Sequence, residues 1–247
     1  MAARLAVWSG PRNISTALMR SWENRPDAMV VDEPLFAHWL AVTGTDHPGR
    51  DDVLAAYEHD WRRVVDQLTG PVPDGVEVFY QKHMAHHLTP EMEHGWMAAL
   101  TNVLLIRDPR EVIASYEKSR PRFVARDLGF EQLAELHDEL AAATGSAPLV
   151  VDAADFLRAP EAYLRAMCDL IGVEFTDRML HWPPGPRDSD GVWAPYWYQH
   201  VWESTGFAPY QPREVTLSGN AREVASECRP AYQRLYDVRL RLPEAAR

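Results

Sequence analysis

The 247-residue sequence has no apolar run of about 18 residues, so no segment is long enough to cross a bilayer as a helix. Its N-terminus lacks the apolar core of a secretory signal and passes directly into a predicted strand. No block of basic residues occurs, and the formal net charge is −11. Such a balance argues against binding to nucleic acid or to anionic membrane surfaces. We therefore expect a cytoplasmic protein that binds neither nucleic acid nor membrane.

Cysteine and lysine are both scarce. The two cysteines, Cys168 and Cys228, lie in helix-like segments, which favours buried free thiols over a disulfide. Of the 25 basic residues, only Lys82 and Lys118 are lysine. A chain that uses arginine almost throughout, yet keeps lysine at position 82, suggests a need for a compact ammonium group there.

Strand-like apolar runs alternate with helical patterns along the first 175 residues. This alternation predicts an α/β fold with three layers, α/β/α, and a mostly parallel central sheet. The expected strands span residues 4–9, 28–33, 76–83, 101–108 and 147–153. The expected helices span residues 15–24, 51–68, 109–119, 130–145 and 159–172.

The composition changes near residue 175. Residues 176–215 are rich in proline and aromatic side chains, which is typical of an irregular covering segment, and a last helix is predicted at about 220–240. With no repeat and no low-complexity linker, we expect one domain over residues 1–247.

The stretch WSGPRNIST, residues 8–16, joins the first strand to the first helix. In open α/β sheets, ligands bind where strands end and helices begin, and a helix N-terminus favours an anion. The sequence therefore predicts a phosphate-binding loop, with candidate residues Gly10, Pro11, Arg12, Asn13, Ser15 and Thr16. The alternative is an ordinary capped helix start, with Ser15 or Asn13 as the cap.

This loop is not that of a GTPase or an ATPase. The pattern GxxxxGK[ST] is missing, and no lysine lies near the loop. Magnesium ligands are not evident either, so we expect no metal.

A second strand-to-helix corner lies in LLIRDPREVIASY, residues 104–116. Arg107 ends the strand, and Ser115 lies two turns into the next helix. Because Asp108 and Pro109 make the turn tight, the two side chains can converge on one phosphate. The alternative is a strand-end arginine in a salt bridge and a buried serine.

GPRNIST and RDPREVIAS, in this order, resemble the two nucleotide-binding motifs of sulfotransferases that use 3′-phosphoadenosine 5′-phosphosulfate (PAPS). Residues 150–175 are similar to the segment that follows these motifs in the family. The resemblance implies a P-loop NTPase-like fold. It assigns the 5′-phosphosulfate to Arg12, Asn13, Ser15 and Thr16, and the 3′-phosphate to Arg107 and Ser115.

The sequence departs from the family pattern in three places, one of which is around Ile14, where the family usually has a glycine. Many members carry lysine where this chain has Arg12, and the C-terminal lysine–glycine signature of the cytosolic hydroxysteroid and phenol enzymes is missing. The likeness is therefore to the bacterial and carbohydrate-type branches.

Sulfuryl transfer to a hydroxyl group needs a general base and positive charge at the leaving phosphate. Glu33, in VVDEPL, resembles a glutamate that faces the acceptor in the carbohydrate branches. His83 is the second candidate, with Lys82 at the leaving group, as in the K-x-H stretch of the cytosolic branch. Because neighbours on a strand point to opposite faces, we expect one of Lys82 and His83 to enter the site. Glu33 could instead cap a helix that begins at Pro34.

The other histidines leave alternatives open. His83, His86 and His87 form an H-x-x-H-H pattern, but without a clear fourth ligand a metal site is disfavoured. His38 and His47, with the aromatic residues between 192 and 207, could line the acceptor side or simply pack.

Together these features predict a PAPS-dependent sulfotransferase, with Glu33 or His83 as the base and Arg12 and Lys82 as cations. It would act on a hydroxyl group of a small molecule. The alternatives are an ATP-using, P-loop-like enzyme and a non-catalytic nucleotide-binding protein. A homodimer is left open by the sequence.

Overall fold

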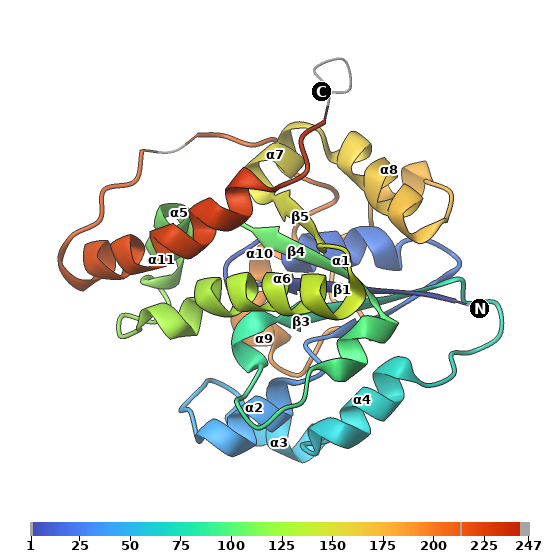
Figure 1. The fold of residues 1–247 in the computed structure, drawn as a ribbon, viewed down its shortest axis with the longest axis horizontal. Coiled ribbons are helices and arrows are strands. Elements are labelled where there is room, and N and C mark those ends of the chain that lie inside the picture. Colours follow the sequence, from blue (N-terminus) through green and yellow to red (C-terminus); the bar gives the residue numbers. More distant parts are fainter. Residues whose placement is uncertain (1, 213, 243–247) are drawn as a thin grey trace.

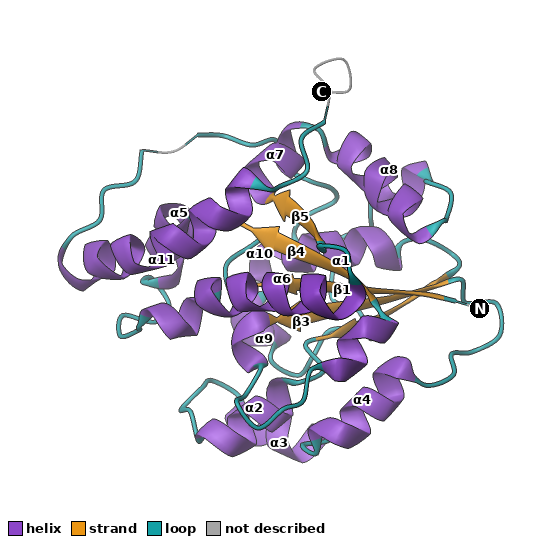
Figure 2. Cartoon of the chain, in the orientation of Figure 1, coloured by secondary structure: helices purple, strands orange, loops and turns teal. Residues whose placement is uncertain are grey.

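The computed structural model describes residues 2–212 and 214–242, and its centre is a five-stranded sheet (Figure 2). The order of the strands is β2-β3-β1-β4-β5, and each neighbouring pair is parallel. The strands are β1 (Ala3–Ser9), β2 (Ala28–Asp32), β3 (Val78–Met84), β4 (Thr101–Ile106) and β5 (Leu149–Asp152). β1 is therefore the central strand, and its carboxyl end lies between those of β3 and β4.

Helices cover both faces of this sheet. One face packs against four helices: α4 (Trp61–Thr69), α5 (Pro109–Tyr116), α6 (Phe130–Thr144) and α11 (Gly219–Asp237). Figure 1 shows α6 and α11 crossing the near side of the sheet. The other face packs against three: α1 (Ser15–Glu23), α7 (Ala153–Arg158) and α8 (Pro160–Ile171). The predicted three-layer α/β class is confirmed.

The helix predicted over residues 51–68 is divided into two. The first part is α3 (Arg50–Ala56), and α4 is the second. The break has a local cause, because Tyr57 is extended (φ −125°, ψ 154°) and the Asp60 carboxylate accepts a hydrogen bond from the Arg62 N–H at 3.0 Å. A carboxylate at this position caps a new helix. Apolar periodicity ran through the break and concealed it.

The covering segment is more ordered than the sequence predicts, although residue 213 lies outside the described part. It holds three short helices: η4 (Asp177–Leu180), α9 (Ala194–Trp197) and α10 (Gln199–Trp202). Asp190 fixes the segment to the body of the protein, since one carboxylate oxygen pairs with the buried Arg20 of α1 and the other accepts from Trp202 Nε1 at 2.8 Å. This anchoring places Tyr198, the residue between α9 and α10, at the carboxyl ends of β2 and β3.

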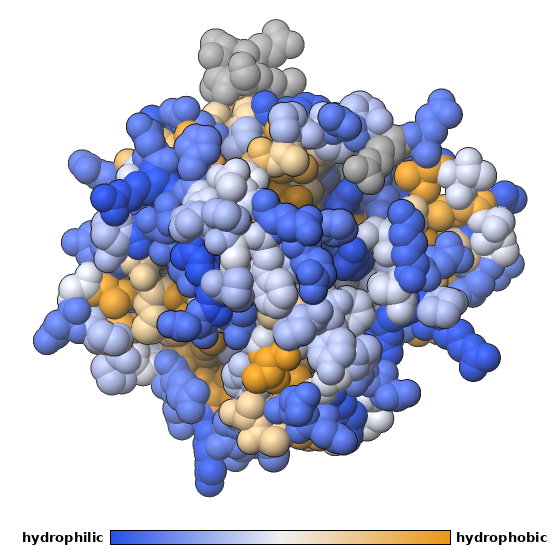
Figure 3. All heavy atoms as spheres, turned by 180° about the vertical axis from the view of Figure 1, so that it is seen from behind, coloured by the Kyte–Doolittle hydropathy of each residue, from blue (hydrophilic) through white to orange (hydrophobic). Residues whose placement is uncertain are grey.

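Both cysteines are buried and unpaired, which confirms the prediction of free thiols. Within the described ranges, no helix combines the length and apolarity needed to cross a membrane. The face turned away in Figure 1 is largely hydrophilic, with small scattered apolar patches (Figure 3).

Candidate active site

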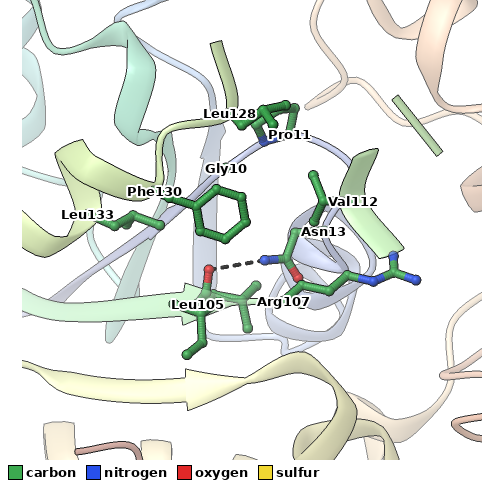
Figure 4. Close-up of a pocket in the computed structure, with 10 residues that line it drawn as sticks. Gly10, Pro11, Asn13, Leu105, Arg107, Val112, Leu128, Phe130 and Leu133 are labelled. Carbon is green, nitrogen blue, oxygen red and sulfur yellow. Dashed lines mark hydrogen bonds between the residues drawn. The ribbon is translucent and has the colours of Figure 1, made fainter. Parts of the chain in front are cut away.

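The first loop spans residues 10–14, between the end of β1 and the start of α1. Gly10 is packed closely against the backbone, because a Cβ atom there would lie 2.2 Å from the carbonyl oxygen of Leu128. Only glycine fits such a contact. The pocket in Figure 4 lies at this junction, with Gly10, Pro11 and Asn13 on one side and Phe130 on the other.

Asn13 ties the loop to the neighbouring strand. Its Nδ2 donates to the Leu105 carbonyl oxygen at 3.0 Å (Figure 4), and its Oδ1 accepts from the Ile14 N–H at 2.8 Å. α1 begins at Ser15, and Ile14 is its N-cap residue, with no side-chain cap hydrogen bond. The alternative interpretation of this loop, a helix start capped by Ser15 or Asn13, is therefore wrong.

The N-terminus of α1 carries no opposing negative charge of its own in its first turn. Ser15 is buried and Thr16 half-buried in the first turn, which contains no acidic side chain. Backbone N–H groups and the helix dipole at such an end favour negative charge.

The structure brings the two predicted corners into contact through Arg12. Arg12 Nε donates to Ser115 Oγ at 3.0 Å, and Arg107 Nη1 donates to the Arg12 carbonyl oxygen at 2.9 Å. Burial, followed by the positive charge of Arg107, lowers the pKa of the Arg12 guanidinium. Two cations held this close together make a strong electrostatic site for an anion.

Arg107 also forms the salt bridge that the alternative interpretation of this corner named. Its Nε and Nη2 donate to Glu111 Oε2 at 3.0 and 2.9 Å, and Tyr210 donates to Glu111 Oε1 at 2.9 Å. A guanidinium has five N–H donors. Two of them are used by Glu111 and a third by the Arg12 carbonyl oxygen. One N–H remains on each terminal nitrogen, and the side chain is 26% exposed and points away from the Phe130 pocket (Figure 4). Glu111 thus fixes Arg107 while leaving two donors for a phosphate.

A second cluster lies at the carboxyl ends of β2 and β3. Lys82 Nζ donates to Asp32 Oδ1, Glu33 Oε1 and Tyr198 Oη, each at 2.7 Å. An ammonium group has three donors, so all are used. Lys82 therefore holds Glu33 in place. The sequence predicts that Lys82 contacts the leaving phosphate, but in this arrangement it has no donor left for that contact.

Glu33 has a strained backbone, with φ at 43°, and Arg12 in the first loop is similar, with φ at 56°. Non-glycine residues at positive φ are uncommon and often lie at functional sites. The helix after Glu33, α2 (Phe36–Thr43), begins at Phe36 with no side-chain cap hydrogen bond. Glu33 therefore does not act as the helix cap considered in the sequence.

The charges in this cluster leave one carboxylate more basic than usual. Burial raises the pKa of Glu33, Asp32 raises it further, and Lys82 opposes both. For Lys82, burial disfavours the charge, but the two carboxylates outweigh it and raise its pKa well above the ordinary value. Lys82 thus stays charged, and the pKa of Glu33 lies above its ordinary value.

His83 points to the opposite face of β3 from Lys82. It is buried, its ring stacks on Trp8 with centroids 4.1 Å apart, and its Nε2 lies 3.2 Å from Gln81 Oε1. Burial lowers its pKa to about 3. The structure therefore brings Glu33 and Lys82 together and separates His83 from both.

The other histidines also have definite places. His38 is buried between the His59 carbonyl oxygen and Thr89 Oγ1, at 2.9 and 3.0 Å. His47 lies against Phe36 and Trp197, with centroids 5.1 and 5.3 Å apart. No group of three potential metal ligands occurs within residues 2–212 and 214–242.

Sequence reasoning missed three members of this region: Asp32, Tyr198 and Glu111. Asp32 carried a usable signal, since it is the last residue of a strand directly before Glu33. Tyr198 carried none, because the aromatic segment that contains it has many similar rings.

The structure is thus an α/β protein in which two strand-to-helix corners, each with an arginine, meet. Residues 3–232 match the family model of the sulfotransferase domain, and the chain belongs to that family.

Solved structures agree on the fold. The sulfotransferase domain from the curacin biosynthetic pathway has a TM-score of 0.52 at 13% identity, covering 92% of this chain and 97% of that one. A sulfotransferase from Alicyclobacillus acidocaldarius has the same TM-score and identity, covering 100% and 99%. At such identities the likeness concerns the fold alone.

Two curated relatives come from Arabidopsis thaliana. They are branched-chain-amino-acid aminotransferase-like protein 2, 36% identical over 92% of this chain, and protein 1, 40% identical over 85%. The chain spans about two fifths of the length of each, 40% and 38%.

Proposed function

We propose that this chain transfers the sulfuryl group of PAPS to a hydroxyl group of a small molecule. The observation that carries the proposal is the junction of Arg12, Ser115 and Arg107, which joins two anion-binding corners into one site. An adenosine with phosphate at both the 3′ and the 5′ position presents two anionic ends, one for each corner. Membership of the sulfotransferase family supports the same ligand.

In this proposal the corners divide the nucleotide between them. Ser15, Thr16 and the N-terminus of α1 hold the 5′-phosphosulfate, and Arg107 and Ser115 hold the 3′-phosphate. Arg12 lies between them and stabilises the charge that grows on the leaving phosphate. Gly10, Pro11 and Asn13 shape the loop.

Glu33 is the proposed general base. Glu33 follows β2 and the first loop follows β1, and these strands are two strand spacings apart, about 10 Å between their axes, so the sulfuryl group and the acceptor oxygen would lie between them. The acceptor O–H bond breaks and its proton passes to Glu33. The acceptor oxygen bonds to sulfur, and the bond from sulfur to the bridging oxygen breaks with its electron pair left on the phosphate. Lys82 is a positioning residue that orients Glu33.

The test is transfer of ³⁵S from labelled PAPS to a panel of hydroxyl compounds. A reaction with water as the acceptor, which is hydrolysis of PAPS, is measured alongside. We expect Glu33→Gln to lower turnover by about a hundredfold, the usual scale for a general base, and to leave the affinity for adenosine 3′,5′-bisphosphate (PAP) unchanged. Tight binding of PAP without any transfer would favour the non-catalytic alternative. Binding of ADP in preference to PAP would favour the ATP-using one.

A further inference from the structure

His87 is a buried histidine whose ring is fixed next to Glu33. It ends the short helix η1 (Ala85–His87), which directly follows β3, and is 1% exposed. The ring stacks on Phe36 with centroids 4.8 Å apart and planes at 4°, and lies 5.2 Å from the ring of Trp39. Such packing fixes the plane of the imidazole ring.

In this orientation the imidazole faces the free oxygen of the proposed base. His87 Nε2 lies 4.0 Å from Glu33 Oε2, which is too long for a hydrogen bond. The other carboxylate oxygen, Oε1, already accepts from Lys82. His87 Nδ1 has no hydrogen-bond partner among the described residues.

The 4.0 Å separation of His87 Nε2 and Glu33 Oε2 allows both atoms to reach one oxygen atom at hydrogen-bond distance. Placed about 2.8 Å from both His87 Nε2 and Glu33 Oε2, it would make an angle of about 90° with them, which a hydroxyl group accommodates. We propose that His87 and Glu33 together seat the acceptor hydroxyl, with His87 donating to its oxygen while Glu33 accepts its proton. This inference rests on the proposed function, and it makes His87 a second residue in contact with the acceptor.

The protonation of His87 suits this role. Burial lowers the pKa of His87 well below the ordinary value, and the positive charges of nearby histidines and of Lys82 lower it further. The ring is therefore neutral and carries one N–H. A carboxylate faces Nε2, whereas Nδ1 faces no partner, and a buried N–H without a partner is costly. The proton therefore lies on Nε2, toward the acceptor. One lone pair of the acceptor oxygen receives this hydrogen bond, and the other attacks sulfur.

The test compares His87→Leu with His87→Gln, whose amide can donate from nearly the same place. Release of PAP from PAPS is measured with water as acceptor, together with calorimetric titration of PAP. We expect His87→Leu to lower turnover by about tenfold to a hundredfold, the range for a misplaced reacting group. We expect His87→Gln to restore most of it, with PAP affinity unchanged in both. His86→Leu is the control for packing, because its ring contacts both Trp39 and His87 but makes no contact with Glu33 among the described residues.

Unchanged turnover in His87→Leu would overturn the proposal. An equal loss in His87→Leu, His87→Gln and His86→Leu would also overturn it, because the loss would then come from disturbed packing and not from a missing hydrogen bond. If the variants do not fold, the ¹⁵N resonances of the wild-type imidazole decide, and a proton on Nδ1 would overturn it. A wild-type protein that binds PAP weakly and releases none from PAPS contradicts the proposed function itself, a different result from loss in the variants alone.

Discussion

Two buried charged residues, Lys82 and Asp32, lie next to Glu33. Neutralising each in a separate variant should shift the pH dependence of turnover, in opposite directions. A general base works in its ionised form, so turnover rises as pH passes through the pKa of Glu33. Lys82→Met removes the cation that lowers this pKa, so the rise should move to higher pH. Asp32→Asn removes the anion that raises it, so the rise should move to lower pH.

The magnitude follows from the contacts. Lys82 Nζ lies 2.7 Å from Glu33 Oε1, and the side chains are 2% and 13% exposed, so solvent screens them little. Unit charges about 3 Å apart at an effective dielectric constant of about 20 interact by about 5 kcal/mol. The cost of desolvation reduces the visible effect to about one to three pH units, the range for a carboxylate beside one cation. The effect of Asp32 on the pKa of Glu33 is smaller than that of Lys82, and we expect a shift of about one unit.

The assay is release of PAP from PAPS at pH values from about 4 to about 9, a range that begins near the ordinary glutamate pKa and extends well above it. The double variant Asp32→Asn/Lys82→Met is the control, because it removes both charges and should place the rise between those of the two single variants. Each variant must first bind PAP with wild-type affinity, which shows that it is folded. Shifts in the same direction for both single variants, or none, would refute Glu33 as the titrating base.

Three further predictions concern single residues. Arg107→Ala should weaken PAP binding by about 2–3 kcal/mol, the value of a charge-assisted contact, in a calorimetric titration; wild-type affinity would remove Arg107 from the nucleotide site. His83→Gln should keep turnover within about threefold of wild type while Glu33→Gln loses about a hundredfold, and the reverse pattern would make His83 the base. Gly10→Ala should lower the free energy of unfolding by about 1–3 kcal/mol because its Cβ meets a carbonyl oxygen, whereas Gly95→Ala, with open space around it, should change it little; equal values in denaturant unfolding would contradict this packing.

Periodicity was sufficient to predict the layers and most strands, because buried parallel strands are nearly continuous apolar runs. It failed at residues 57–60, where the break between α3 and α4 depends on one capping carboxylate and not on apolar spacing. The single domain over residues 1–247 stays a prediction.

The first and second corners could be located from the sequence because backbone chemistry recurs there: a glycine in a tight turn, a proline at a helix start, and arginines at strand ends. Their contact through Arg12 and Ser115 could not, because it joins residues 103 positions apart across the sheet. The role of Lys82 was also hidden. Its three partners come from β2, the residue after it and the covering segment, and no local pattern shows that they use every donor.

The measurement that tests the central claim most directly is a calorimetric comparison of PAP with ADP on the wild-type chain, without added acceptor. If the corners at Arg12 and Arg107 hold opposite ends of one doubly phosphorylated adenosine, PAP should bind at least about a hundredfold more tightly than ADP, since ADP lacks the 3′-phosphate and its two contacts. Equal affinities, or tighter binding of ADP, would contradict the account.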